Sequence, residues 1–238
     1  MSIKSVLIVT ALVSSICIAE TTIDPSSPYA HGANIGFINA YADGTNGAII
    51  GQSYCSGYLY GANVGWIHIG NGSPANNIQY GNTSNSDCGI NHDGMGSLTG
   101  YAYGANIGWI NFEQTLGKPK VDLITGDLSG YAWGANVGWI NLEGITTLSI
   151  DSGSDSDTDG IPDAWEYGHT NTLLVLSDGN KDSDGDGIPD TAEYLSDTDP
   201  FDAGDLLVIT DLNVMDSTNM VTWTSKSTRL YNLQYASA

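Results

Sequence analysis

Basic side chains are scarce in this sequence. Lys and Arg together number 6 against 27 Asp and Glu in 238 residues, which gives a formal net charge of −21 at pH 7. Of the acidic residues, 16 lie between Asp151 and Asp205, where Lys181 is the only basic side chain. Proteins that bind nucleic acid use Lys and Arg to neutralise phosphates, so this composition excludes nucleic acid as a partner.

Long apolar runs are also lacking beyond the start of the chain. One run, residues 6–18, follows Lys4 and ends in a small-x-small pattern at Cys17-Ile18-Ala19. The alternative, a membrane anchor, is disfavoured because a spanning helix needs about 20 apolar residues. We interpret residues 1–19 as a removed signal peptide, and we expect a mature chain that is secreted or held at the cell surface and has no transmembrane segment.

Cysteine is rare as well, with three in the chain. Removal of the signal peptide leaves Cys55 and Cys88. An even number of cysteines in an exported protein predicts a disulfide between them. Free buried thiols are the alternative.

A repeat with a spacing of about 30 residues dominates residues 20–150. Its four units read YAHGANIGFIN (29–39), YLYGANVGWI (58–67), YAYGANIGWIN (101–111) and YAWGANVGWIN (131–141). The Gly-Ala-Asn turns begin at Gly32, Gly61, Gly104 and Gly134, and a long insertion that carries Cys88 separates the second unit from the third. Such a period is typical of stacked or circularly arranged supersecondary units.

Each unit has the composition of β-structure. In the fourth, residues 121–124, 128–133 and 137–142 are short runs rich in β-branched and aromatic residues, separated by turn residues. Alternation puts Val137 and Trp139 on one face of the last run and Ile140 on the other, which favours burial between layers. We predict a mainly β fold in which three-stranded β-meanders form a sandwich, a prism or a solenoid.

Two recurring aromatic positions invite different interpretations. One position holds tryptophan in three units, and we predict that these residues are core: Trp66, Trp109 and Trp139. The other varies in chemistry and favours a displayed surface, with Tyr60, Tyr103 and Trp133 at the place of His31 in the first unit. Because sugars stack on aromatic faces, a glycan is a candidate partner.

Two acidic segments fit the pattern D-x-D-x-D-G-x-x-D-x-x-E, residues 155–166 (DSDTDGIPDAWE) and 182–193 (DSDGDGIPDTAE). Calcium takes about six to eight oxygen ligands, and carboxylates at alternate positions of a tight loop can converge on it. Gly160 and Gly187 permit the sharp turn, and Pro162 and Pro189 lead into short helices. The predicted Ca2+ ligands, with the isoleucines acting through their backbone carbonyls, are Asp155, Asp157, Asp159, Ile161, Asp163 and Glu166 in the first loop and Asp182, Asp184, Asp186, Ile188, Asp190 and Glu193 in the second. Asp163 is expected to act directly or through water, and Asp190 takes the same role.

The segment 151–205 resembles the bacterial thrombospondin type 3 repeat, in which a DxDGDGxxDxxE loop is followed by a Thr-Asp-Pro step, here Thr198-Asp199-Pro200. The resemblance implies a calcium-rigidified spacer without catalysis. It also implies a second tier of ligands, namely Asp178, Asn180, Asp197, Asp199 and Asp202. One departure is the insertion at residues 169–176, which we expect to pack as a strand or a hydrophobic plug and which puts close coupling between ions in doubt.

Enzyme signatures are weak in the sequence. The four histidines, His31, His68, His92 and His169, show neither metal-protease spacing nor an obvious Ser or Cys partner. The carboxylates that a glycosidase would need lie mostly in the calcium loops. We therefore expect no catalytic activity.

Residues 206–238 form a C-terminal β segment with expected strands at 206–214, 221–225 and 230–235. These strands either pair with the repeat domain or leave an edge open for another chain. The favoured hypothesis is a secreted, calcium-stabilised structural or surface protein that self-associates, for example as a subunit of an extracellular filament or layer. A secreted carbohydrate-binding module or adhesin is the alternative, and an accessory fragment of a larger secreted enzyme is a third hypothesis.

Overall fold

The computed structural model describes residues 21–214 and 219–226. The chain divides into two compact units. The first comprises the described residues up to Ser156 together with 162–167, and the second comprises 157–161 and the described residues from Gly168 onward. The expected signal peptide, residues 1–19, lies outside the described residues.

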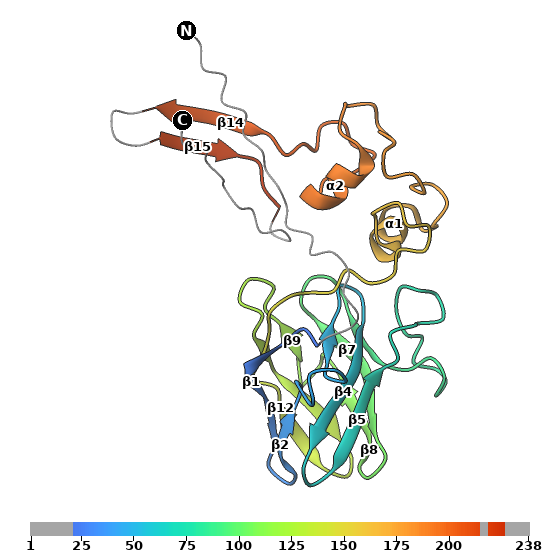
Figure 1. Ribbon diagram of the computed structural model, residues 1–238, viewed down its shortest axis with the longest axis vertical. Helices are drawn as coiled ribbons and strands as arrows, with labels where there is room; N and C mark the ends of the chain where they lie inside the picture. The colour runs from blue at the N-terminus through green and yellow to red at the C-terminus, as the bar shows by residue number, and fades with distance from the viewer. Residues whose placement is uncertain (1–20, 215–218, 227–238) are drawn as a thin grey trace. The chain divides into compact units, whose positions relative to one another are not determined.

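Eight antiparallel strands close into a β-barrel in the first unit (Figure 1). The strand order is β12-β11-β8-β7-β5-β4-β2-β1, and β12 also pairs with β1, which joins the two ends. These strands are β1 (Ile23–Gly32), β2 (Gly36–Asn39), β4 (Cys55–Gly61), β5 (Gly65–Gly70), β7 (Leu98–Gly104), β8 (Gly108–Phe112), β11 (Tyr131–Gly134) and β12 (Gly138–Asn141). The mainly β prediction is confirmed, but the units are two-stranded hairpins of a closed barrel, and the predicted three-stranded meanders are not observed.

Five short strands accompany the barrel. Three of them extend the main sheet, with β3 (Ile49–Ile50) on β4, β6 (Ile90–His92) on β7 and β13 (Ile145–Thr147) on β1. The other two, β9 (Lys120–Val121) and β10 (Leu128–Ser129), pair with each other. The run 121–124, expected as the first strand of a meander, is therefore outside the barrel wall.

Each Gly-Ala-Asn sequence forms the turn of one hairpin. In the first, the Ile35 amide donates to the Gly32 carbonyl at 3.1 Å, and Gly36 follows with a φ of +79°. This is a three-residue hairpin loop that is followed by a left-handed glycine, the first residue of β2. The other hairpins repeat it with the same 3.1 Å hydrogen bond. Glycine is needed after the turn because side chains rarely adopt this backbone conformation.

The asparagine of each turn links one hairpin to its neighbour. Its Nδ2 donates at 3.0 Å to the backbone carbonyl of the residue that follows the asparagine in the adjacent unit. The four bonds run from Asn34 to Val137, from Asn63 to Ile35, from Asn106 to Val64 and from Asn136 to Ile107. Because the first unit bonds to the fourth, the hydrogen bonds follow the barrel around its whole circumference.

Strand alternation fills the barrel with small and branched aliphatic side chains. The inward residues are between 0% and 3% exposed at Ala30, Ile38, Ile67, Ala102, Ile110, Ala132 and Ile140. An eight-stranded barrel has an interior just wide enough for side chains to fill. The hydrophobic core of the first unit is thus the barrel lumen.

The prediction that the repeated tryptophans are core is wrong. Trp66, Trp109 and Trp139 are 44%, 43% and 40% exposed. Ile140 points into the barrel, so the preceding Trp139 must point outward. Val137 is buried as a turn residue and does not share a strand face with Trp139. The expected display of the second aromatic position is confirmed, since its members are 41%, 43% and 40% exposed at Tyr60, Tyr103 and Trp133.

The predicted disulfide is also wrong, because both cysteines are free. Cys55 is 1% exposed and belongs to the hydrophobic core of the barrel. Burial raises the pKa of its thiol to about 12, which keeps it protonated. Cys88 lies in the insertion between the second and third repeats and lines a pocket with exposed aromatic residues. The two thiols therefore occupy different sides of the barrel wall.

Two short helices follow the acidic loops, α1 (Asp163–Thr170) and α2 (Asp190–Ser196). Each begins directly after an Ile-Pro pair, as expected. Pro189 has the extended angles φ −68° and ψ 148° and so ends the loop before α2. The insertion at 169–176 forms no strand. Its Leu176 is fully buried, in the manner of a plug, while Leu174 is 82% exposed.

The C-terminal strands pair with each other. Strands β14 (Ile209–Val214) and β15 (Asn219–Trp223) form a two-stranded antiparallel sheet. They fall within the expected strands 206–214 and 221–225, apart from the first two residues of β15. The third expected strand, 230–235, lies outside the described residues.

Candidate calcium loops and aromatic surface

The second acidic loop brings three carboxylates together. Asp182, Asp184 and Asp186 each offer an oxygen, and these oxygens lie within 4.8 Å of one another. The Asp182 carboxylate folds the loop around itself, because it accepts the amides of Gly187 at 2.8 Å and Gly185 at 2.7 Å. The backbone hydrogen bonds, above all that from Gly187, lower the pKa of Asp182.

Four carboxylate oxygens of this loop are buried without a hydrogen-bond partner. They are Oδ2 of Asp184, Oδ2 of Asp186 and both side-chain oxygens of Glu193. Glu193 is 1% exposed. A buried, unpaired carboxylate is strongly destabilising, so these oxygens need a counter-charge. A hard divalent cation with oxygen ligands would supply it, and the residues present fit calcium.

Electrostatics of the loop lead to the same conclusion. Burial raises the pKa of Glu193 to about 8, and the charges of Asp184, Asp186, Asp190 and Asp182 add to the effect. A bound cation would favour the charged form of the carboxylate and so reverse the shift. Asp182, Asp184, Asp186 and Glu193 are the side chains that would hold the ion.

The first acidic loop repeats this arrangement. Asp155, Asp157 and Asp159 again offer oxygens within 4.8 Å of one another. Asp159 accepts the amide of Ile161 at 2.8 Å, as the third aspartate of the second loop accepts the amide of its isoleucine at 2.6 Å. Glu166, the last position of the pattern, is 1% exposed. The sequence pattern thus brings the first three carboxylates of each loop together.

Asp163 and Asp190 have a defined structural role. Both oxygens of Asp163 bind Ser156, at 2.8 Å to its amide and 2.6 Å to its hydroxyl. Asp190 binds Ser183 in the same way, at 2.9 and 2.7 Å. Both aspartates are fully buried. These carboxylates hold the second residue of each loop in place, a contact that the ligand pattern did not predict.

The backbone carbonyls of Ile161 and Ile188 remain predicted ligands. The Ile161 side chain is fully buried and that of Ile188 is 38% exposed, so the two loops differ in how they pack. The second-tier candidates lie outside the two carboxylate clusters of the described chain. Several of them cap turns of the backbone: Asp178 accepts the amide of Asn180, Asp199 accepts that of Phe201, and Asp202 accepts that of Gly204.

Exposed aromatic side chains cover the outer face of the barrel. This aromatic surface consists of Tyr29, Phe37, Tyr58, Tyr60, Trp66, Tyr101, Tyr103, Trp109, Tyr131, Trp133 and Trp139, which are between 38% and 65% exposed. Within each repeat the rings contact one another. In the third, Trp109 lies 4.9 Å from Tyr103 and 6.2 Å from Tyr101, measured between ring centroids.

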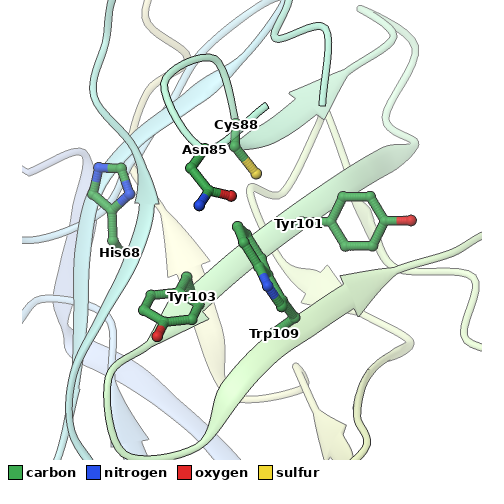
Figure 2. A pocket seen from close by; sticks show the side chains of 6 residues that line it. All are labelled: His68, Asn85, Cys88, Tyr101, Tyr103 and Trp109. Atoms are coloured by element: carbon green, nitrogen blue, oxygen red, sulfur yellow. The ribbon is translucent and has the colours of Figure 1, made fainter. Parts of the chain in front are cut away.

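A pocket of about 310 Å³ opens on this surface beside the third repeat (Figure 2). It is lined by His68 of β5, Asn85 and Cys88 of the insertion, Tyr101 and Tyr103 of β7, and Trp109 of β8. None of these side chains is acidic or a lysine or arginine. This pocket was not predicted from the sequence, although histidine at position 68, where the other units have asparagine, was a visible signal.

Within the described residues, no helix has the length and apolar character needed to cross a membrane. No protein-family model, curated protein or solved structure matches the chain.

Proposed function

We propose that this chain is a secreted, calcium-stabilised protein that binds carbohydrate through the aromatic surface of its β-barrel and has no catalytic activity. Secretion is supported by the signal-peptide pattern of residues 1–19. The absence of catalysis is supported by the positions of the carboxylates. Most of them lie in the two acidic loops, where the proposed calcium ligation and the hydrogen bonds of the turns already account for them.

Calcium binding is supported by the buried oxygens of Asp184, Asp186 and Glu193, which have no hydrogen-bond partner. Extracellular calcium modules typically bind with dissociation constants of about 10⁻⁴ to 10⁻³ M. We therefore expect the loops to be occupied in a medium with millimolar calcium. The resemblance to thrombospondin type 3 repeats supports the same role.

Carbohydrate binding is carried by one observation, the outward orientation of eleven aromatic rings on one small barrel. Soluble proteins rarely expose large contiguous apolar surface without a partner for it. Tyr and Trp combine an apolar ring with a polar group, which suits the alternating C–H and O–H surface of a sugar. The exposure of these rings favours a display surface over a structural repeat core.

The test is retention of the purified mature chain on insoluble polysaccharides, followed by a glycan array. We expect retention by the wild type and its loss in the triple variant Trp66→Ala, Trp109→Ala, Trp139→Ala. Phe201→Ala is the control, since Phe201 is 46% exposed but lies outside the barrel. Failure of the wild type to bind any polysaccharide or arrayed glycan would refute the carbohydrate proposal.

A second candidate function, self-association into a filament or layer, is favoured by β14 and β15. In the described residues these strands pair with no other strand. Exposed apolar side chains include Leu212 at 59% and Met220 at 50%. Unpaired strand edges can accept a strand from a second chain. Electron microscopy in calcium tests this function, and a monodisperse monomer at every concentration would contradict it.

A further inference from the structure

Neighbouring hairpins of the barrel meet at equivalent cross-strand pairs, and one of these pairs differs from the rest. The four pairs are Asn39 with Tyr60, His68 with Tyr103, Asn111 with Trp133 and Asn141 with His31. Three of them place an asparagine beside an aromatic or imidazole ring. Between the second and third repeats, His68 takes the place of the asparagine.

The insertion that follows the second repeat is firmly attached beside this pair. Tyr80 is 3% exposed, its hydroxyl donates to the Cys55 carbonyl at 3.2 Å, and it accepts the Gly72 amide at 2.8 Å. The Asn91 side chain accepts the Tyr80 amide at 2.8 Å and donates to the Tyr80 carbonyl at 2.9 Å. These contacts fix the base of the insertion on the barrel.

The tip of the insertion also has a defined shape. The Asp87 carboxylate accepts the amide of Gly81 at 2.9 Å and that of Ala75 at 3.2 Å. The Asn82 side chain accepts the amide of Gly89 at 3.1 Å. Asn85 and Cys88 belong to this hydrogen-bonded segment. They therefore form a defined wall of the pocket beside the aromatic rings.

The resulting pocket has the chemistry of a site for a neutral sugar. Figure 2 shows Asn85 and Cys88 on one side and Tyr103 and Trp109 on the other, with His68 beside them. Its volume of about 310 Å³ is at the lower end of the range for small-molecule sites. Burial lowers the pKa of His68, which favours the neutral imidazole with one donor and one acceptor nitrogen.

We infer that this pocket is the principal carbohydrate site of the barrel: a hexose-type ring packs on Tyr103 and Trp109, and its hydroxyl groups bond to His68 and Asn85. The inference rests on the carbohydrate-binding function proposed above and adds its location and ligand class. The other three junctions between hairpins have asparagine at the position of His68 and lack this insertion. The aromatic surface as a whole then contributes weaker contacts along a longer glycan.

The experiment uses the full mature chain with calcium and a panel of neutral mono- and disaccharides, including glucose, galactose, mannose and N-acetylglucosamine. Affinity is measured by calorimetry or by ligand-observed NMR. Trp109→Ala is compared with Trp139→Ala, its counterpart in the fourth repeat, which has nearly the same exposure. His68→Asn restores the residue found in the other repeats. Circular dichroism and melting temperature verify that each variant folds.

We expect Trp109→Ala to weaken binding at least about tenfold and His68→Asn to weaken it by about threefold to tenfold, which correspond to the loss of one ring contact or of hydrogen bonds. Trp139→Ala should leave the affinity for these small sugars within about twofold of the wild type. If sugars bind but the two tryptophan variants weaken binding equally, or neither does, the pocket assignment is overturned while carbohydrate binding stands. If the wild type binds no glycan of any length, both proposals are refuted.

Discussion

The side chain of Asn34 donates a hydrogen bond at 3.0 Å to the backbone carbonyl of Val137, a residue 103 positions further along the chain. This contact joins the first repeat to the fourth. The other three asparagine bonds join repeats that follow one another in sequence. This bond therefore adds to the pairing of β12 with β1 that closes the barrel.

Asn34→Ala should lower the free energy of unfolding of the barrel by about 1–2 kcal/mol, because it removes a hydrogen bond and leaves the Val137 carbonyl with one partner fewer. Urea unfolding followed by circular dichroism measures the change. Ala33→Ser, an exposed substitution in the same turn, is the control. Equal stability of Asn34→Ala and the wild type would contradict the closing role of this contact.

His92 should make the stability of the barrel depend on pH. It is 1% exposed, its Nε2 accepts the Gly96 amide at 2.9 Å, and its Nδ1 lies 2.8 Å from the Gly51 carbonyl. The ring is therefore neutral with its proton on Nδ1. Burial lowers the pKa of His92, so the unfolded chain binds a proton more readily than the folded chain does.

The stability from this residue is complete above the unfolded pKa of about 6.5 and is lost progressively as the pH falls below it. We expect the melting temperature to drop between pH 7.5 and pH 5.5 by more in the wild type than in His92→Gln. His31→Gln, at an exposed position, should show the same drop in melting temperature over this pH range as the wild type. If the melting temperature of His92→Gln falls with pH as much as that of the wild type does, His92 is not the source of the pH dependence.

The two thiols should react very differently in the folded mature chain. Cys55 is buried, and its raised pKa of about 12 keeps it out of the reactive thiolate form. Cys88 is partly exposed. A thiol reagent should therefore modify one cysteine in the native protein and two after unfolding, and Cys88→Ser should abolish the native reaction. Two cysteines that stay unreactive until a reductant is added would show that they form a disulfide.

The repeat predicted the strands well but not their arrangement. Each YAxGANxGWIN unit contains the hairpin that the structure shows, because its turn and its alternation are local properties. The closed barrel depends on contacts between units, such as Asn34 with Val137, which no local pattern reveals. Trp139 was wrongly predicted to be core because Val137 was placed on the same strand face. Val137 belongs to the turn, and the strand begins at Gly138.

The acidic loops show the same division between local and long-range information. The convergence of Asp182, Asp184 and Asp186 was predictable, because alternate carboxylates in a tight turn face one centre. The pairing of Asp190 with Ser183 was missed, because the pattern assigns a function to the aspartate and none to the serine. The pocket at Trp109 was missed because it needs the insertion to pack on the barrel wall.

Calcium titration of the mature chain by isothermal calorimetry, comparing the wild type with Glu193→Gln, tests the central claim most directly. We expect the wild type to bind calcium at submillimolar to millimolar concentration, at about 10⁻⁴ to 10⁻³ M, and Glu193→Gln to lose the site in the second loop. Glu143→Gln removes an exposed charge in the repeat domain, outside every predicted ligand set, and should bind as the wild type does. If the wild type releases or absorbs no heat of binding at millimolar calcium, or if Glu193→Gln binds as well as it does, the buried carboxylates of the second loop are not a calcium site.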